Sequence, residues 1–148
     1  MKKYLALVLA LAMMLTMVAI PTMAEEDNRP TIRVTILDRA QVPADQGTYE
    51  DNWATRWINE NSPVKVDFVA CPRGSTYSNY NLWLAAGEAP DVIMEFQPEY
   101  VEEWANAGLL IDMKDYLDEY APNYRKLTPE ATQKWGVYNG GEYAITQE

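Results

Sequence analysis

The 148-residue sequence contains no histidine, a single cysteine and no glycine-rich phosphate-binding pattern. Without histidine, the chain cannot build a His-based catalytic triad or a zinc site that needs imidazole. With Cys71 alone, it can form neither an intrachain disulfide nor a thiolate metal cluster, and Cys71 is expected to be a small hydrophobic residue at the edge of a loop and not a nucleophile. The missing glycine patterns argue against a nucleotide site. We therefore expect no cofactor and no metal.

Positive charge is also scarce, with 12 Lys and Arg against 22 Asp and Glu and a net charge of −10. Such a chain has no electrostatic attraction for nucleic acid, so no nucleic-acid partner is expected. The acidic residues Asp45, Glu50 and Asp51 lack the spacing of a calcium-binding loop and give only a weak metal signal.

The one long hydrophobic run lies at the N-terminus, at residues 4–20, after Lys2 and Lys3. This layout predicts a signal peptide over residues 1–24 that is cleaved between Ala24 and Glu25. A membrane anchor is the alternative, and the polar linker at residues 25–30 favours cleavage. Because no cysteine stands at the cleavage point, we expect an exported protein, extracellular or in the cell envelope or periplasm, without a lipid anchor.

The rest of the chain alternates between strand and helix patterns. Ile32, Val34 and Ile36 share one face of the first predicted strand. Gly87 and Pro90 separate a helix from a third strand. A hairpin is predicted from 137–138 and 143–145 around an Asn139-Gly140 turn. The predicted strands are 31–37, 64–69 and 91–96, and the predicted helices are about 52–60, 75–86, 98–108, 112–120 and a short one capped by Thr128. This order predicts an α/β fold with a parallel sheet built from βαβ units.

Ligands of parallel sheets bind beyond the carboxyl ends of the strands, which here are loops 38–47, 71–75 and 95–98. By loop position, the candidate ligand-binding residues are Arg39, Arg73, Glu95, Phe96 and Gln97. Tyr77 lies near the same edge. The alternatives are surface positions for the two arginines and capping of the Pro98 helix by Glu95. For the tryptophans, packing between helix and sheet is favoured over stacking on sugar rings.

Four segments resemble bacterial ABC-importer solute-binding proteins, the family that binds sugars and oligosaccharides. They are TILDRAQVPADQGTYEDN at 35–52, LAAGEAPDVI at 84–93, AGLLIDMKDYL at 107–117 and YNGGEYAI at 138–145. The resemblance implies a periplasmic-binding-protein-like (type II) fold. Residues 31–148 would be the first part of its N-terminal lobe. It also implies a monomeric, non-catalytic protein that closes on a solute and docks on the transmembrane subunits of a permease.

The resemblance also has departures. Members of the family usually run to several hundred residues, and Thr146 stands where the family has proline. We therefore expect either a fragment of a longer gene or a truncated reading frame, with weak solute binding and low stability in isolation. Two other interpretations stay open. One is a secreted carbohydrate-active enzyme using Glu95 and Asp38, and the other is a small exported interaction domain.

Overall fold

The computed structural model describes residues 27–147. The predicted signal peptide, its cleavage point at Ala24 and Glu25, and the start of the polar linker lie outside this range. The strands are β1 (Thr31–Asp38), β2 (Lys65–Pro72), β3 (Val137–Tyr138) and β4 (Gly141–Glu142). The helices are α2 (Trp53–Asn61), η1 (Arg73–Ser75), α3 (Thr76–Ala86), α4 (Pro98–Asn106), α5 (Lys114–Tyr120), α6 (Pro122–Leu127), α7 (Glu130–Gln133) and η2 (Lys134–Gly136).

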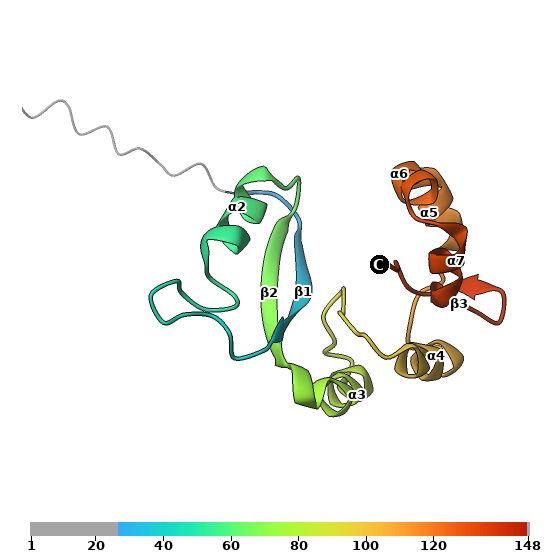
Figure 1. Cartoon of the computed structure of the whole chain (residues 1–148), viewed down its shortest axis with the longest axis horizontal. Helices are drawn as coiled ribbons and strands as arrows, with labels where there is room; N and C mark the ends of the chain where they lie inside the picture. The colour runs from blue at the N-terminus through green and yellow to red at the C-terminus, as the bar shows by residue number, and fades with distance from the viewer. Residues whose placement is uncertain (1–26, 148) are drawn as a thin grey trace, which may run out of the picture.

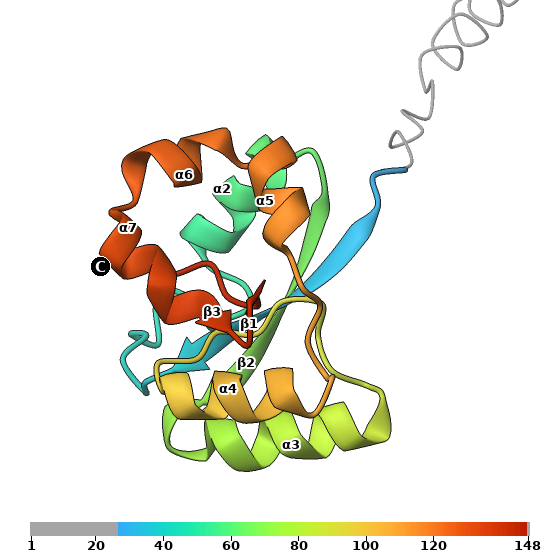
Figure 2. The same ribbon diagram turned by 90° about the vertical axis from the view of Figure 1, so that its right-hand side faces the viewer.

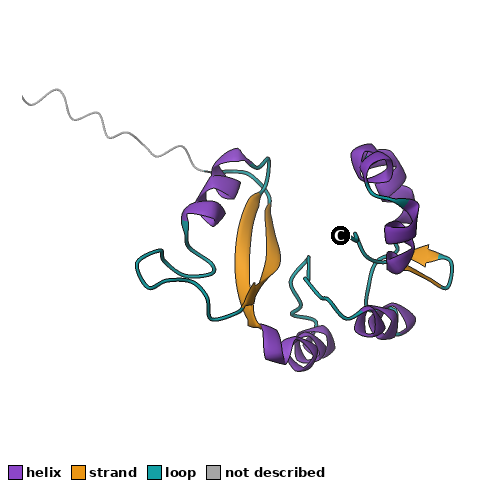
Figure 3. Cartoon of the chain, in the orientation of Figure 1, coloured by secondary structure: helices purple, strands orange, loops and turns teal. Residues whose placement is uncertain are grey.

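A parallel pair of strands organises the N-terminal half. β1 and β2 pair in register, from Thr31 opposite Lys65 to Asp38 opposite Pro72. Parallel strands need a crossover connection, and α2 supplies it. Figure 1 and Figure 3 show α2 on one side of this pair and the helices α4 to α7 on the other. The predicted α/β class with a parallel βαβ unit is confirmed.

Helix α2 contacts the sheet through polar side chains. Asn52 caps the helix by accepting from the backbone N–H groups of Ala54 and Thr55. Asn59 then pairs with the backbone of Val66 in β2, donating at 2.9 Å and accepting at 2.7 Å. This anchor turns the Thr55–Asn59 side of the helix inward. It leaves the opposite side, with Trp53 and Trp57, in solvent.

The predicted packing of tryptophans between helix and sheet is therefore wrong for Trp53 and Trp57, which are 71% and 60% exposed. It is also wrong for Trp135, which is 65% exposed. It is confirmed for Trp104, which is 1% exposed and packs edge-on against Tyr80. Sequence periodicity identifies which residues share a helix face, but it does not say which face the sheet covers.

The core lies between β1, β2, α3 and α4. Cys71, Tyr80 and Trp104 form its centre, and α3 and α4 lie side by side in Figure 2. On β1 the most buried residues are Thr35 and Leu37. They lie on the face opposite Ile32, Val34 and Ile36, the residues that the predicted pattern puts on one face. Cys71 is completely buried in β2, and not at the edge of a loop as predicted.

The junction after α3 is formed as predicted. Gly87 takes a left-handed conformation with φ 70° and ends the helix, where its N–H donates to Leu84 O. The chain then returns to the sheet beside β1.

The predicted third strand at 91–96 is largely wrong. Only Val92 forms a ladder contact, a parallel bridge to Val34, in which Thr35 N donates to Val92 O at 2.9 Å and Val92 N donates to Arg33 O at 3.0 Å. The next ladder position is occupied by a side chain, since Met94 N donates to Thr35 Oγ1 at 2.7 Å. Within residues 27–147 no further strand pairs along the other edge of this segment. A regular strand is therefore not propagated.

The C-terminal part is built from short helices and a hairpin. Asn139 (φ 50°) and Gly140 (φ 87°) form the predicted Asn-Gly turn between β3 and β4. The second arm is Gly141–Glu142, not the predicted 143–145. It is displaced because this two-residue turn puts Gly141 directly opposite Tyr138. Helix α6 was not predicted, and α7 begins after Pro129 with no side-chain cap, so the cap predicted at Thr128 is wrong.

Candidate functional site

A cleft of about 330 Å³ opens at the carboxyl ends of the parallel strands. It lies at the end of β1, the start of η1 and α3, and the segment that enters α4. Leu37, Arg73, Glu95, Phe96 and Gln97 line it. The cleft thus brings four of the five candidate ligand-binding residues to one place.

Two guanidinium groups approach the ring of Phe96 at this cleft. The ring is 54% exposed. The Cζ atom of Arg39 is 5.5 Å from its centroid, and that of Arg73 is 5.7 Å away. Both distances are in the range of cation–π attraction. Arg39, the fifth candidate, is thereby brought to the same aromatic ring.

Glu95 uses its two carboxylate oxygens differently. Oε1 accepts from Phe96 N at 2.6 Å and from Gln97 N at 3.0 Å, which fixes the turn into α4. Oε2 is buried and has no hydrogen-bond partner among residues 27–147. Gln97, not Glu95, occupies the N-cap position of α4. Glu95 therefore orders the backbone at the cleft and keeps one acceptor oxygen unused.

The loop that carries Arg39 is held by Tyr49. The phenol oxygen accepts from Arg39 N and Gln41 N, both at 2.9 Å. Gly47 (φ 97°) lets the loop close tightly, because an added Cβ would lie 2.2 Å from Asp51 O. The Tyr49 hydrogen bonds and the Gly47 turn thus hold the loop that carries Arg39 to Phe96.

Two further aromatic residues line the cleft. The sequence predicts Tyr77 near this edge and does not identify Tyr100. Tyr77 and Tyr100 pack against each other with tilted rings whose centroids are 4.4 Å apart, and the Tyr77 hydroxyl donates to Glu103. Tyr100 lies in the first turn of α4, just beyond the predicted loop 95–98, and was therefore not among the candidates. The Pro98 helix start was the one signal that could have located it.

Tyr80 supports the floor of the site. Its hydroxyl donates to Met94 O at 2.9 Å and lies 3.3 Å from Thr35 Oγ1. Burial raises the pKa of this phenol well above its usual value. It stays a neutral donor that fixes the segment before Glu95.

The acidic candidates outside the cleft have local partners. Asp38 Oδ1 accepts from Ala40 N at 2.7 Å, within its own turn. Asp51 pairs with Arg56 at 2.6 Å. Among the described residues, no group of three or more Cys, Asp or Glu side chains is arranged to hold a metal ion.

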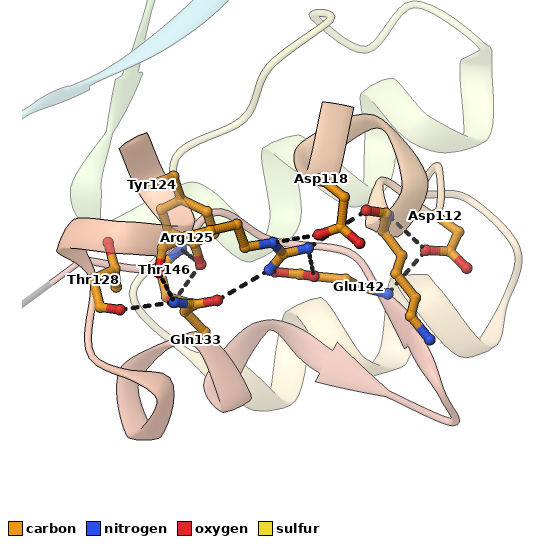
Figure 4. A network of polar contacts seen from close by, with 9 residues as sticks. Asp112, Asp118, Tyr124, Arg125, Thr128, Gln133, Glu142 and Thr146 are labelled. Carbon is orange, nitrogen blue, oxygen red and sulfur yellow. Dashed lines mark hydrogen bonds and ion pairs between the residues drawn. The ribbon is translucent and has the colours of Figure 1, made fainter. Parts of the chain in front are cut away.

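A second polar cluster joins the C-terminal elements (Figure 4). Arg125 of α6 makes a two-pronged contact with Glu142 of β4, at 2.8 and 2.7 Å, and a further 2.7 Å contact with Asp118 of α5. Glu142 is nearly buried, with a side chain 4% exposed. These carboxylates raise the pKa of Arg125, mainly through the hydrogen bonds from Glu142. Because every charge here is paired inside the protein, the cluster is structural.

Asp112 connects the same cluster to the start of α5. Its Oδ1 accepts from Glu142 N at 2.9 Å and from Lys114 N at 3.0 Å. These two backbone hydrogen bonds lower the pKa of the carboxyl group.

Comparison with known proteins gives the family and the fold. The profile described as bacterial extracellular solute-binding protein matches residues 40–145. No curated protein sequence matches the chain significantly. Within residues 27–147 no helix has the length and apolar character needed to cross a bilayer.

Solved structures share the fold at low identity. An HMO-binding ABC-transporter-associated solute-binding protein from Bifidobacterium longum infantis has a TM-score of 0.60 at 22% identity, covering 79% of this chain and 23% of that chain. The S. pneumoniae substrate-binding protein FusA, in complex with kestose, has a TM-score of 0.62 at 20% identity, with coverage of 77% and 23%. The sugar-binding protein MalE of Xanthomonas citri has a TM-score of 0.58 at 18% identity, with coverage of 76% and 27%.

This chain therefore spans about a quarter of the length of the structures it resembles. The shared architecture is that of type II periplasmic-binding-protein-like folds. Since the profile matches well over half of the chain, the chain belongs to the bacterial extracellular solute-binding protein family.

Proposed function

We propose that residues 31–148 form part of the first lobe of a solute-binding protein that captures a sugar or oligosaccharide outside the cytoplasm. The solute would pass to the transmembrane subunits of an ABC permease. The signal peptide would be cleaved between Ala24 and Glu25, which leaves an exported monomer without a lipid anchor. The family and the sugar-related names of its structural neighbours support this proposal.

The observation that carries the proposal is the cleft at the carboxyl ends of β1 and β2. It combines an exposed aromatic side chain, Phe96, with a carboxylate, Glu95, whose Oε2 is buried and unpartnered. Sugars present apolar faces that stack on aromatic rings and hydroxyl groups that donate to carboxylates. Burial of the solute would require a second lobe that closes over this cleft.

The test uses the complete gene product, meaning the polypeptide encoded by the whole open reading frame. We expect titration calorimetry with a panel of oligosaccharides to detect binding. Alanine at Arg39, Arg73, Glu95, Phe96 or Gln97 should weaken it. Unchanged affinity in all five variants would remove the assignment of the site.

The same panel tests whether the protein is only a carrier. Glu95 and Asp38 are engaged in separate backbone turns, and we expect the solute to be bound without chemical change. Chromatography of the mixture after prolonged incubation should show the intact oligosaccharide. Released products would favour the secreted carbohydrate-active enzyme.

A further inference from the structure

Two arginines at the cleft differ from the other arginines of the described chain. Four guanidinium groups each contact a carboxylate, at 2.6 to 3.7 Å. These belong to Arg29, Arg33, Arg56 and Arg125. Within residues 27–147 no acidic side chain pairs with Arg39 or Arg73, and neither guanidinium donates a hydrogen bond. In a chain with 22 acidic residues and a net charge of −10, two unpaired cations at one site are unexpected.

Both unpaired groups converge on the same ring. Arg39 comes from the loop after β1 and Arg73 from the turn after β2, and each approaches Phe96 within 6 Å of its centroid. Two like charges that approach one ring repel each other, and cation–π attraction to the ring offsets only part of that repulsion. A bound anion would offset the rest.

The start of α3 adds to the positive potential. Ser75, Thr76 and Ser78 line the same cleft. The helix is 11 residues long, its N-cap has no side-chain hydrogen bond, and its first turn holds no acidic residue. The positive end of the helix dipole is thus open toward the cleft. By itself this is a weak effect, but it has the same sign as the two guanidinium groups.

The one carboxylate in the cleft does not neutralise these groups. Glu95 Oε1 is engaged by Phe96 N and Gln97 N, and neither arginine lies within ion-pair distance of either oxygen. The cleft therefore presents two cationic groups to an anion, while the unpartnered Oε2 of Glu95 is buried.

From this juxtaposition we infer that the solute is an acidic sugar that carries a carboxylate, as a uronic-acid oligosaccharide does. The planar fork of arginine matches a carboxylate in a two-pronged geometry. The sugar ring would lie against the exposed part of Phe96. This inference rests on the proposed function and goes beyond it, because kestose, the ligand named for one structural neighbour, is a neutral sugar.

The experiment measures calorimetric affinity of the complete gene product for uronic-acid oligosaccharides and for their methyl esters, which keep the rings and lose the charge. We expect the acids to bind at least about tenfold more tightly than the esters, as a charge-assisted hydrogen bond predicts. Arg39→Gln and Arg73→Gln should each remove most of that difference and leave the midpoint of thermal unfolding unchanged. Arg56→Gln, which changes an exposed arginine paired with Asp51, is the matched control and should retain the full difference.

Each other outcome counts against the inference in its own way. If neutral oligosaccharides or the esters bind as tightly as the acids, the inference fails and the proposed function stands. If sulfated oligosaccharides bind and carboxylated ones do not, the assignment to a carboxylate is wrong. If no sugar of any kind binds, the proposed function fails, and the inference fails with it.

Discussion

Thr35 illustrates how a single side chain shapes the approach to the site. It is 1% exposed, and its hydroxyl accepts the Met94 N–H that a regular third strand would direct to a backbone carbonyl. Sequence alternation predicts a strand at 91–96 but cannot reveal that a hydroxyl on the neighbouring strand occupies one ladder position. The candidate residues at 95–97 were found because a strand end, even an irregular one, still lies at the carboxyl edge of a parallel sheet.

Replacement of Thr35 by valine keeps the shape and removes the acceptor. The part-buried Met94 N–H would lose its partner, and we expect the free energy of unfolding to fall by about 1 kcal/mol or more. Urea unfolding of the complete gene product measures it. Thr31→Val, at an exposed position of the same strand, is the control and should change stability by less than about 0.5 kcal/mol. Equal effects of the two substitutions would contradict this role of Thr35.

Among the elements, helices with clear caps and stops were the most predictable from sequence. Asn52 and Gly87 set the start of α2 and the end of α3 through local hydrogen bonds. Orientation was less predictable, because the Asn59–Val66 contact that turns Trp53 and Trp57 outward joins a helix to a strand edge. The ion pair between Arg125 and Glu142 also depends on the tertiary fold.

That ion pair joins α6 to the hairpin and gives a prediction about the C-terminal elements. Arg125→Met would leave the buried Glu142 carboxylate without its main partner, and we expect a loss of about 3–5 kcal/mol in the free energy of unfolding. Lys134→Met provides the control, since Lys134 pairs with Glu130 on an exposed helix surface. Chemical unfolding should show a loss below about 0.5 kcal/mol for this control. A similar loss in both variants would argue against a structural role for the cluster.

Asp112 predicts a pH effect in the same elements. Its folded-state pKa lies below the ordinary value of 3.8 because it accepts two backbone hydrogen bonds. Its contribution to stability is therefore complete above the unfolded-state pKa and is lost as pH falls through the lower folded-state pKa. Between about pH 2 and pH 5, unfolding free energies should fall less steeply with decreasing pH in Asp112→Asn than in the wild type. If the free energy of unfolding depends on pH with the same slope in both proteins, Asp112 does not contribute to the pH dependence of stability.

For the whole molecule, apolar surface outside the core is the dominant feature. Within residues 27–147 the buried hydrophobic residues are Leu37, Cys71, Tyr80, Trp104 and Leu117. Large apolar side chains exposed elsewhere include Trp53, Ile111, Tyr120, Leu127 and Trp135. The sequence predicted the family and the α/β class because these depend on local order along the chain. It could not identify which apolar faces remain uncovered.

This exposure predicts the behaviour of residues 25–148 in isolation. We expect a broad thermal transition and strong binding of a hydrophobic dye, because large exposed apolar patches favour association over a unique compact state. Calorimetry and dye fluorescence on the purified segment measure both. A sharp, cooperative transition of a monomer, with a midpoint that rises when sugar is added, would contradict the expectation.

The most direct test of the account compares two affinities for oligosaccharides. One is that of the complete gene product, and the other is that of a variant that lacks the aromatic side chain at the centre of the cleft. Titration calorimetry should show binding by the wild type and a loss of about tenfold or more in Phe96→Ala, as removal of a stacking aromatic predicts. Leu82→Ala, at a position 66% exposed on α3 and outside the cleft, should bind like the wild type. Full affinity in Phe96→Ala, or no binding of any oligosaccharide by the wild type, would contradict the central claim that this cleft receives a sugar.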